Sequence, residues 1–329
     1  MAIIKLKTQS AKRLPCRQAG KTRSQFGRVG VLMGGPSTER EISFKSGKAV
    51  YEALKQSGLE VVAIDINTDS REENISLIKS HKIDCAFLAL HGRFGEDGQM
   101  QGILEILKIP YTGSGVQASR LAMDKPASRE IFQAHGLNVP RYMVLERTTL
   151  DSNIRHGLGL PAVIKPAAHG SSIGLSIIDK EEGLRSAIDL AFTFDERVII
   201  EEYIKGREVT VGILDECALP IIEIVPKKMF FDYEAKYQPG LTDYIVPAKL
   251  EEVISGKIKE AALRAHKLLG CFGCSRADMI LNRGDLPYLL EVNTIPGLTT
   301  TSLLPRAAKC AGIEFNELCL RLIELAYRQ

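Results

Sequence analysis

The stretch SRADMILNRGDLPYLLEVN, residues 275–293, contains two apolar segments, Ala277–Leu281 and Tyr288–Val292, separated by the turn sequence NRGD. Turn residues between two such segments predict a β-hairpin. Because side chains alternate between the two faces of a strand, Glu291 and Asn293 share a face, and Asp278 can meet them from the partner strand. Two carboxylates and one amide oxygen suit Mg²⁺. A solvated surface hairpin is the alternative, and the apolar neighbours disfavour it, because buried carboxylates need a partner.

A loop of small residues, KPAAHGSSIG at 165–174, follows the expected strand Pro161–Lys165. Small residues let backbone N–H groups approach phosphate oxygens, and Lys165 adds a fixed positive charge. The loop is not a Walker A motif, because no Gly-Lys-Ser/Thr follows. A plain turn into the next strand, Leu175–Ile178, would explain the glycines equally well. The loop therefore indicates phosphate binding only in combination with other motifs.

A third motif lies at the end of the expected strand Val198–Tyr203. Glu201-Glu202-Tyr203-Ile204 combines polar and apolar residues, and Glu208 follows a short way on. A strand end of this kind can hold the edge of an adenine, and a nearby acid can hold a ribose diol. The spacing alone is a weak indication of nucleotide binding.

The N-terminal segment, from about residue 28, alternates strands with helices. Three apolar strands are expected, namely Val29–Met33, Glu60–Ile66 and Cys85–Leu90. This succession predicts a parallel sheet, which presents ligand groups at the C-terminal ends of its strands. Gly34-Gly35 and His91-Gly92 occupy such ends. We expect Ser37 or Thr38 to cap the first helix and a second helix around Ile75–Ser80.

The remainder of the chain predicts further helices and strands around one irregular segment. The helices are expected at Gln99–Leu107, Lys125–His135, Glu182–Ala191, Lys257–Leu269 and Leu318–Tyr327. Strand Val209–Leu214 is expected to follow a turn at Gly206. Residues 227–243 are rich in aromatic side chains and have no regular period, which favours a lid. We expect a tail at 1–27 and domains at 28–123, 124–208 and 209–329, the last of which carries the lid and the hairpin.

The composition is that of a globular protein with a core, at 329 residues, 45% hydrophobic and 25% charged. Length alone suggests about two domains. The sequence contains no apolar run long enough to span a bilayer and no secretory signal, so we expect a cytoplasmic protein without membrane contact. Seven scattered cysteines argue against a disulfide framework. Cys271 and Cys274 form a CxxC without a second pair, which favours plain thiols over a zinc site.

The first 28 residues hold eight Lys and Arg and no acid, so the other 301 residues carry −5 of the net +3. A solvated extension is the simplest interpretation of this basic tail. Polyanion binding and a transit-like role are the alternatives. We expect no nucleic-acid partner for the folded body.

Seven stretches occur in order along the chain: GGPSTEREISFKSG, LHGRFGEDGQMQG, YTGSGVQASRLAMDK, IKPAAHGSSIG, DYEAKY, SRADMI and LLEVNTIPGLTTTSL. Together they resemble the D-alanine–D-alanine ligases, a family of the ATP-grasp superfamily. The resemblance runs from about Val29 to the C-terminus and excludes only the tail. It implies an α/β protein, α+β in its C-terminal half, with an ATP-grasp fold behind a Rossmann-like parallel-sheet domain.

The resemblance also implies a two-step reaction. ATP phosphorylates the carboxylate of one D-alanine, and the amino group of a second displaces the phosphate. By similarity, Glu39 holds the ammonium group of the first D-alanine and His91 lies beside that substrate. Arg276 and the backbone N–H of Gly297 are expected to bind carboxylate or oxyanion charge. The carboxylate of the second D-alanine is expected at two residues, Ser302 and Leu303.

The remaining residues that match the family's motifs concern ATP, its metal ions and the lid. The expected phosphate ligands are Lys125, Lys165 and Lys236; the expected adenine and ribose ligands are Glu201, Glu202, Tyr203, Ile204 and Glu208. Asp278, Glu291 and Asn293 match the ligands of two Mg²⁺ ions, for which Mn²⁺ can substitute. Ser171 and Tyr237 match the pair that, with Glu39, ties the phosphate loop to the lid.

Some residues depart from the family's pattern. The family often has Glu-Lys where this chain has Glu201-Glu202, a position that acts mainly through its backbone. His169 stands where the family varies and is often acidic, and Phe231 replaces a tyrosine of some members. Ligases that make D-alanyl-D-lactate usually have a longer lid without Tyr237, so the resemblance favours a dipeptide product. D-Alanyl-D-lactate ligation and a non-catalytic ATP sensor are the alternatives, and a homodimer is the expected assembly.

Overall fold

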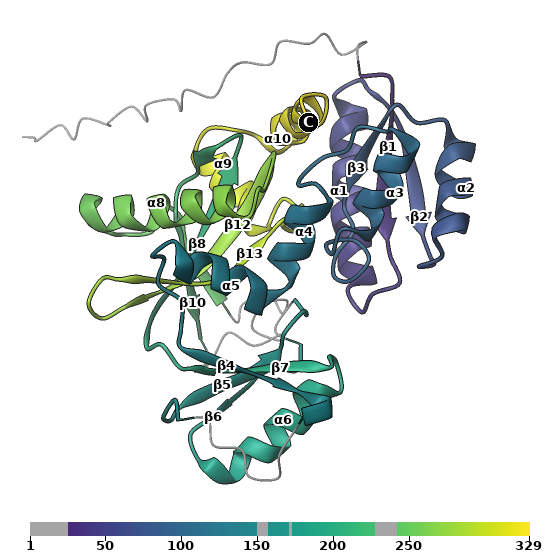
Figure 1. The fold of residues 1–329 in the computed structure, drawn as a ribbon. Helices are drawn as coiled ribbons and strands as arrows, with labels where there is room; N and C mark the ends of the chain where they lie inside the picture. Colours follow the sequence, from purple (N-terminus) through teal and green to yellow (C-terminus); the bar gives the residue numbers. More distant parts are fainter. Residues whose placement is uncertain (1–25, 150–156, 171–172, 228–241) are drawn as a thin grey trace, which may run out of the picture.

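The computed structural model describes residues 26–149, 157–170, 173–227 and 242–329. Three sheets carry the architecture (Figure 1). The first sheet, with its helices, lies to one side of the other two, which face each other. Within the described ranges, no helix is both long enough and apolar enough to cross a membrane.

The N-terminal sheet is parallel, with the strand order β2-β1-β3. Its strands are β1 (Arg28–Gly34), β2 (Glu60–Ile66) and β3 (Cys85–Leu88), and its helices are α1 (Arg40–Gln56), α2 (Arg71–His81) and α3 (Gln99–Leu107). Strand β1 is apolar and almost fully buried because helices cover both faces of the sheet. The expected parallel sheet is confirmed.

The start of α1 differs from the expectation. Glu39 is the residue at the N-cap, and neither Ser37 nor Thr38 caps the helix. The Ser37 hydroxyl instead accepts the Glu39 N–H at 3.2 Å and donates to the His91 carbonyl at 2.6 Å. Ser37 thus joins the ends of β1 and β3, which holds the two candidate substrate loops together.

The central sheet is antiparallel, with the strand order β4-β7-β5-β6. Its strands are β4 (Tyr142–Glu146), β5 (Ala162–Pro166), β6 (Ser176–Ile178) and β7 (Arg197–Glu202), and helix α6 (Leu184–Phe192) covers one face. Ile188 and Phe192 of α6 pack on Ile164 and Ile200 of the sheet. The other face is left for the cavity described below.

The C-terminal sheet is antiparallel along β11-β10-β8-β12-β13, with β9 beside β8. Its strands are β8 (Gly206–Leu214), β9 (Cys217–Ala218), β10 (Ile222–Pro226), β11 (Thr242–Ile245), β12 (Cys274–Asn282) and β13 (Pro287–Asn293). Helices α4 (Val116–Met123), α5 (Lys125–Ala134) and α8 (Glu252–Leu268) pack around this sheet (Figure 1). The expected hairpin is thus confirmed as β12–β13.

Gly206 starts β8 and is not a separate turn. A Cβ on Gly206 would lie 2.1 Å from the Leu281 carbonyl oxygen of β12. Only glycine fits at this close approach. The pairing of Gly206 with Asn282 also means that β8 begins before residue 208, where we expected a domain limit. The division at 123 and 208 stays a prediction.

The last two helices, α9 (Leu303–Cys310) and α10 (Phe315–Ala326), return toward the N-terminal sheet. Leu318 and Leu322 of α10 belong to the same buried cluster as Val31 and Phe87. The Tyr327 hydroxyl donates to the Phe26 carbonyl at 2.6 Å. Residues from both ends of the described chain therefore complete one core (Figure 1).

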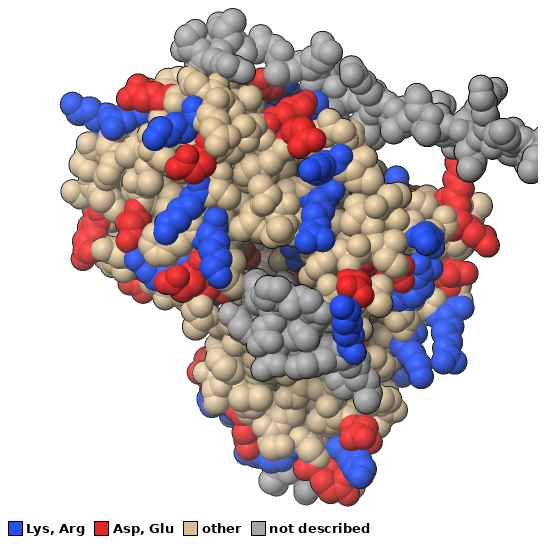
Figure 2. Space-filling view, turned by 180° about the vertical axis from the view of Figure 1, so that it is seen from behind, with Lys and Arg blue, Asp and Glu red and all other residues tan. Residues whose placement is uncertain are grey.

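The surface and the cysteines bear on possible partners. On the face seen in Figure 2, basic and acidic side chains are interspersed, and neither sign dominates. The six cysteines that the structure describes are free thiols. Burial raises the pKa of Cys271 and Cys274 to about 12, so both are inert thiols at neutral pH.

Candidate active site

A cavity of about 610 Å³ lies between the central and C-terminal sheets. Strands β5 and β7 line one side, and β8, β10, β12 and β13 line the other. Its lining includes most of the expected ATP and metal residues: Lys125, Lys165, Glu201, Glu202, Tyr203, Ile204, Glu208, Arg276, Asp278 and Glu291. A volume of this size is typical of small-molecule sites.

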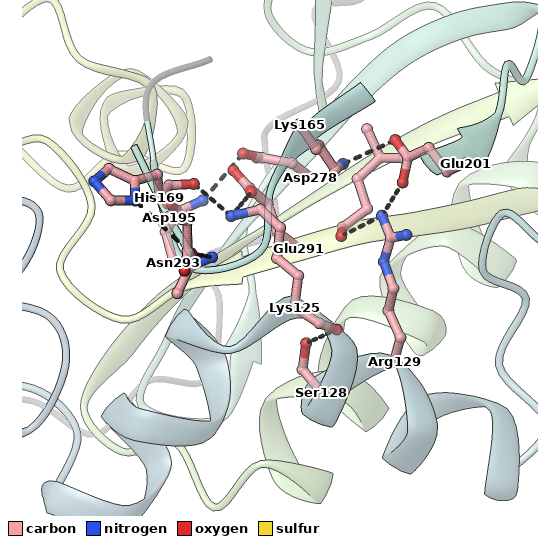
Figure 3. Close-up of polar contacts among 12 residues, drawn as sticks. Lys125, Ser128, Arg129, Lys165, His169, Asp195, Glu201, Asp278, Glu291 and Asn293 are labelled. Carbon is pink, nitrogen blue, oxygen red and sulfur yellow. Dashed lines mark hydrogen bonds and ion pairs between the residues drawn. The ribbon is translucent and has the colours of Figure 1, made fainter. Parts of the chain in front are cut away.

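A buried ion-pair chain crosses the β7 side of the cavity (Figure 3). Lys165 Nζ lies 2.8 Å from Glu201 Oε1, and Arg129 Nη2 lies 2.5 Å from Glu201 Oε2. Burial acts to raise the pKa of Glu201, but the charges of Arg129 and Lys165 outweigh it and hold that pKa below its usual range. Glu201 is therefore ionised at neutral pH.

Lys165 has the opposite balance. Burial is the largest influence and lowers its pKa to about 8, although Glu201 acts to raise it. Arg129 and Lys125 lower that pKa further, because a nearby cation disfavours a second positive charge. Lys165 is thus charged at neutral pH and loses its proton in the mildly alkaline range.

Lys125 connects the phosphate loop to the hairpin. Its Nζ donates to the His169 carbonyl at 2.5 Å and lies 3.3 Å from Glu291 Oε2. The side chain is buried at the start of α5, whose first turn is capped by the Asp124 carboxylate. Lys125 thus holds the loop and the hairpin to one another across the cavity.

Asp195 holds the loop from the other side. Its Oδ2 accepts the Ala168 N–H at 2.7 Å, and the His169 ring lies nearby. Burial acts to raise the pKa of Asp195, but His169 and the N–H groups of Ala168 and Arg197 hold it at about 2. Lys125 and Asp195 together fix the first residues of the phosphate loop.

The candidate metal ligands meet at the end of the hairpin. Asp278 pairs with Glu291 across β12–β13, and a bulge follows at Met279. Asn293 Nδ2 donates to Asp278 Oδ2 at 3.0 Å. Arg276 reaches both oxygens of Asp278, at 2.8 and 2.6 Å. The carboxylate is thus at the centre of this corner (Figure 3).

The residue types of this corner fit a hard divalent cation. Asp278, Glu291 and Asn293, on two neighbouring strands, can each offer an oxygen ligand. The Thr210 hydroxyl on β8 donates to Asp278 Oδ1 at 2.6 Å and orients that carboxylate. The described residues contain no group of three or more His, Cys, Asp and Glu side chains that would hold a metal unaided. Mg²⁺ usually takes only one or two carboxylates and completes its shell with water and phosphate, so two carboxylates and an amide suffice.

Glu202 differs from its neighbour Glu201. Its carboxylate turns away to Arg141, whose Nε lies 2.7 Å away and whose N–H donates at 3.0 Å. The backbone of Glu202 continues the pairing of β7 with β5. The charge of Glu202 is therefore neutralised by Arg141, and its backbone is held in place on the cavity wall.

The expected first-substrate residues gather at the ends of β1 and β3. Glu39 is buried, and a Cβ on Gly92 or Gly170 would lie 2.8 or 3.5 Å from its Oε2. The carboxylate therefore stands between the β3 loop and the phosphate loop. His91 Nε2 lies 3.0 Å from Ser46 Oγ, and His91 Nδ1 lies 3.2 Å from Glu96 Oε1.

The segment after β13 closes this corner. The Leu298 N–H donates to Ser46 Oγ at 3.3 Å, which places Gly297 next to the His91 group. Ser302 accepts the Thr299 N–H at 3.1 Å and stands at the N-cap of α9. Leu303 lines the main cavity. Gly297, Ser302 and Leu303 thus lie on the segment that links β13 to α9, and a Cβ on Gly297 would lie 3.0 Å from Ser302 Oγ.

Some expected residues lie outside this picture. Ser171, Lys236 and Tyr237, with most of the lid at 227–243, fall outside the described residues. The roles of the other site residues stay predictions, although the described ones gather around two neighbouring corners.

Several residues of the site were missed in the sequence. Arg129, Ser46, Glu96 and Thr210 all make buried or partly buried polar contacts with expected residues. Arg129 follows Lys125 by four residues on the buried face of α5, a spacing that could have indicated it. Ser46 and Glu96 lie within two of the stretches that carry the family resemblance, whereas Thr210 has no distinctive spacing.

Comparison with known proteins identifies the family. The family description "D-ala D-ala ligase C-terminus" matches residues 131–324, and "D-ala D-ala ligase N-terminus" matches residues 28–76 and 68–114. A D-alanine–D-alanine ligase of Pelotomaculum thermopropionicum is 48% identical over 310 residues, which cover 91% of this chain and 96% of the relative. A second ligase of that name, from Geotalea uraniireducens, is 47% identical over 91% of this chain and 95% of its own length.

The fold is shared as well. The crystal structure of D-alanine–D-alanine ligase from Bacillus anthracis complexed with ATP is similar, with a TM-score of 0.81 and 36% identity. The similarity covers 92% of this chain and 98% of that chain. The expected α/β architecture with an ATP-grasp half is thereby confirmed. Both halves match and the relatives align over nearly the whole described length, so the chain belongs to the D-alanine–D-alanine ligase family.

Proposed function

We propose that this protein is an ATP-dependent ligase that joins two molecules of D-alanine to D-alanyl-D-alanine. A carboxylate oxygen of the first D-alanine attacks the γ-phosphorus of ATP, and the bond to ADP breaks. The amino nitrogen of the second D-alanine then attacks the acyl phosphate carbon. Phosphate leaves from the tetrahedral intermediate, and the new amide loses a proton. The product serves the synthesis of cell-wall peptidoglycan.

The cavity between the two antiparallel sheets is the proposed ATP site. The observation that carries this proposal is that the buried cations Lys125 and Lys165 stand beside the Asp278–Glu291 corner. Both cations already have a carboxylate partner, Glu291 for Lys125 and Glu201 for Lys165. Their ammonium groups stand in one cavity with the candidate metal ligands, where they would meet phosphate oxygens as charged donors. The adenine would lie along the strand end at Glu201–Ile204, and Glu208 would hold the ribose. Lys236, from the lid, would complete the phosphate ligands.

The metal ligands of the proposed site are Asp278, Glu291 and Asn293. Two Mg²⁺ ions, or Mn²⁺ in their place, would neutralise the phosphate charge when bound. The carboxylates supply the negative charge, and Thr210 and Arg276 orient Asp278 for the task. Arg276 is also close enough to this corner to meet developing negative charge on the substrate.

The first D-alanine would occupy the corner between the N-terminal strand ends and the phosphate loop. Glu39 would bind its ammonium group, and His91, held by Ser46 and Glu96, would lie beside it. The N–H of Gly297 would support Arg276 at the oxyanion. Ser302 and Leu303 would contact the carboxylate of the second D-alanine. Ser171 and Tyr237 are proposed to link Glu39 to the lid, a role that rests on sequence resemblance.

The setting of the enzyme is part of the same proposal. We expect a cytoplasmic homodimer in which each chain binds its own ATP and D-alanine. The dimer and the location rest on the family resemblance and on the sequence.

The decisive experiment measures phosphate release from ATP with Mg²⁺, with products resolved by mass. The substrates are D-alanine, L-alanine, and D-alanine with D-lactate. Formation of D-alanyl-D-alanine from the D-isomer alone is the expected result. A depsipeptide from D-lactate would leave the fold and the metal corner intact but would contradict the dipeptide assignment. Binding of ATP without turnover on any of these substrates would contradict the ligase.

The lid makes a separate contribution that the same assay can test. If Tyr237 shapes the choice of the second substrate, Tyr237→Phe will raise D-lactate use relative to D-alanine. An unchanged ratio would remove Tyr237 from that role without affecting the assignment of the reaction.

A further inference from the structure

Arg129 is a buried charge that the proposed mechanism does not use. It lies on α5, its side chain is 0% exposed, and it stands one helical turn after Lys125. Its Nε and Nη1 groups have no hydrogen-bond acceptor among the residues that the structure describes. An arginine is rarely buried in this way unless its charge serves an anion, and the anion here is Glu201.

The contacts of Arg129 reach both sheets that enclose the cavity. Its Nη2 lies 2.5 Å from Glu201 Oε2 on β7 and donates to the Leu290 carbonyl on β13 at 3.3 Å. Its guanidinium also stacks over the ring of Tyr142 on β4, with Cζ 5.2 Å from the centroid. One side chain from a helix thus touches the central and C-terminal sheets at the proposed adenine end (Figure 3).

The shared partner, Glu201, gives this arrangement a consequence for ATP binding. Glu201 pairs with Lys165 through Oε1 and with Arg129 through Oε2. Lys165 is also an expected phosphate ligand, so a bound nucleotide competes with Glu201 for it. Were Lys165 the sole cation at Glu201, its departure would leave a buried carboxylate unpaired, which is strongly unfavourable.

We propose that Arg129 is a positioning residue for ATP: it keeps Glu201 paired and in place when Lys165 turns from Glu201 to the phosphates. This inference rests on the proposed placement of ATP in the cavity. Because Arg129 stays on Glu201, the adenine strand end keeps its position and Lys165 becomes available at little cost. Arg129 touches no reacting atom in this scheme and acts through Glu201 and Lys165.

The charges around Lys165 agree with that division of roles. Glu201 and Glu291 favour its charged form, whereas Arg129 and Lys125 disfavour it, and burial lowers its pKa to about 8. Arg129 therefore opposes the effect of Glu201, because its positive charge lowers the pKa of Lys165. A bound phosphate would favour the charged form of Lys165, because it adds negative charge near Lys165, Lys125 and Arg129.

The test uses the full-length enzyme with variants at Arg129, Gln133 and Glu201. Arg129→Met removes the charge and keeps the length, and Arg129→Lys keeps the charge but not the planar fork. Gln133→Met is the matched control, because Gln133 is exposed one turn further along the same helix. Glu201→Gln, alone and with Arg129→Met, completes a double-mutant cycle. The measurements are the Kd of ADP with Mg²⁺ by calorimetry, kcat, and the KM values of ATP and D-alanine.

The expected result separates nucleotide binding from general damage. Arg129→Met should weaken ADP binding by at least about tenfold, since one partner of a buried ion pair is lost. The KM of D-alanine should stay within about twofold, as for a site that the change does not reach. Arg129→Lys should recover part of the ADP affinity, and Gln133→Met should match wild type. In the Glu201→Gln background, the further loss caused by Arg129→Met should shrink.

Several results would overturn the inference. The inference fails if the Kd of ADP for Arg129→Met lies within about twofold of the wild-type value. An equal rise of the ADP Kd and the D-alanine KM would show a merely structural role, as would a full effect in the Glu201→Gln background. If Arg129→Met does not fold, the test relies on Arg129→Lys and Glu201→Gln. Unaltered ADP binding in both of these variants would contradict a role for the Arg129–Glu201 pair. If wild type binds no ADP, the proposed function fails first, and this inference with it.

Discussion

Arg276 and Asp278 stand two residues apart on one face of β12 and form a two-point ion pair, with Nε 2.8 Å from Oδ1 and Nη2 2.6 Å from Oδ2. The proposed oxyanion group and the proposed metal ligand are therefore in direct contact. Replacing either residue frees the other from its partner, so the effects of the two replacements should not be additive.

Asp278→Asn tests the metal corner. Loss of one of the two carboxylates should raise the Mg²⁺ concentration for half-maximal activity by about tenfold or more and should lower turnover. A Mg²⁺ titration of phosphate release at saturating ATP measures both. Asp285→Asn, in the exposed turn of the same hairpin, is the control and should behave as wild type. An unaltered titration for Asp278→Asn would show that the hairpin does not hold the metal.

Arg276→Ala tests the oxyanion role. Removal of a donor to developing negative charge should lower kcat on the order of 10²-fold. The measurement is steady-state kcat with D-alanine and ATP both saturating, with ADP binding as a check on the intact nucleotide site. Arg283→Ala removes an exposed arginine from the same hairpin and should change little. A kcat near wild type in Arg276→Ala would remove that residue from the chemistry.

Lys165 predicts an alkaline limit to ATP use. Its pKa is lowered to about 8, chiefly by burial, so its positive charge is present below pH 8 and is lost as the pH rises above it. The value of kcat/KM for ATP, which reports groups of the free enzyme, should therefore fall above about pH 8. Lys165→Arg keeps its charge throughout this range and should lose the alkaline fall, whatever its absolute activity. If kcat/KM for ATP falls in the same way in Lys165→Arg, the titrating group is not Lys165.

Leu322→Ala tests the core that α10 shares with the N-terminal sheet. Leu322 is 1% exposed, and its truncation should lower the free energy of unfolding by about 2–5 kcal/mol. Urea denaturation followed by circular dichroism measures the change. Leu190→Ala, at a leucine that is 45% exposed on α6, should cost no more than about 0.5 kcal/mol. Equal effects in the two variants would contradict a shared core.

Much of the fold follows from local patterns. Strand Glu60–Ile66 and helix Gln99–Leu107 have the expected bounds, and the hairpin lies where its turn sequence predicts. Helix α2 begins at Arg71 rather than Ile75, because Ser70 accepts the Glu73 N–H and caps an earlier, polar turn. Such a turn has little apolar periodicity and is hard to see in a sequence.

Other elements were missed for a similar reason. Helices α4 and α9 are eight residues each, too short for a clear helical period. Strands β4, β10 and β11 acquire their identity from neighbours that are distant in the sequence, as Tyr142 does from Glu201. Strand pairing of this kind is a tertiary property, which a single-sequence pattern does not contain.

The site shows the same division. The carboxylates and lysines could be predicted because their chemistry and family motifs are distinctive. Arg129 has only its spacing from Lys125 as a signal in the sequence, since its burial depends on Tyr142 and Glu201 from other elements. Thr210 could not be predicted, because its contact with Asp278 depends on the pairing of β8 with β12.

The core that Phe87 and Val31 share with Leu318 and Leu322 of α10 sets an order on the assembly of the chain. Translation delivers the N-terminal sheet first, but α10 leaves the ribosome only after more than two hundred further residues have been made. Until then the first sheet has α1 but not its last covering helix. The segment that is synthesised first therefore finishes folding only when the last helix arrives, and a nascent chain stalled before residue 315 would still expose part of this core.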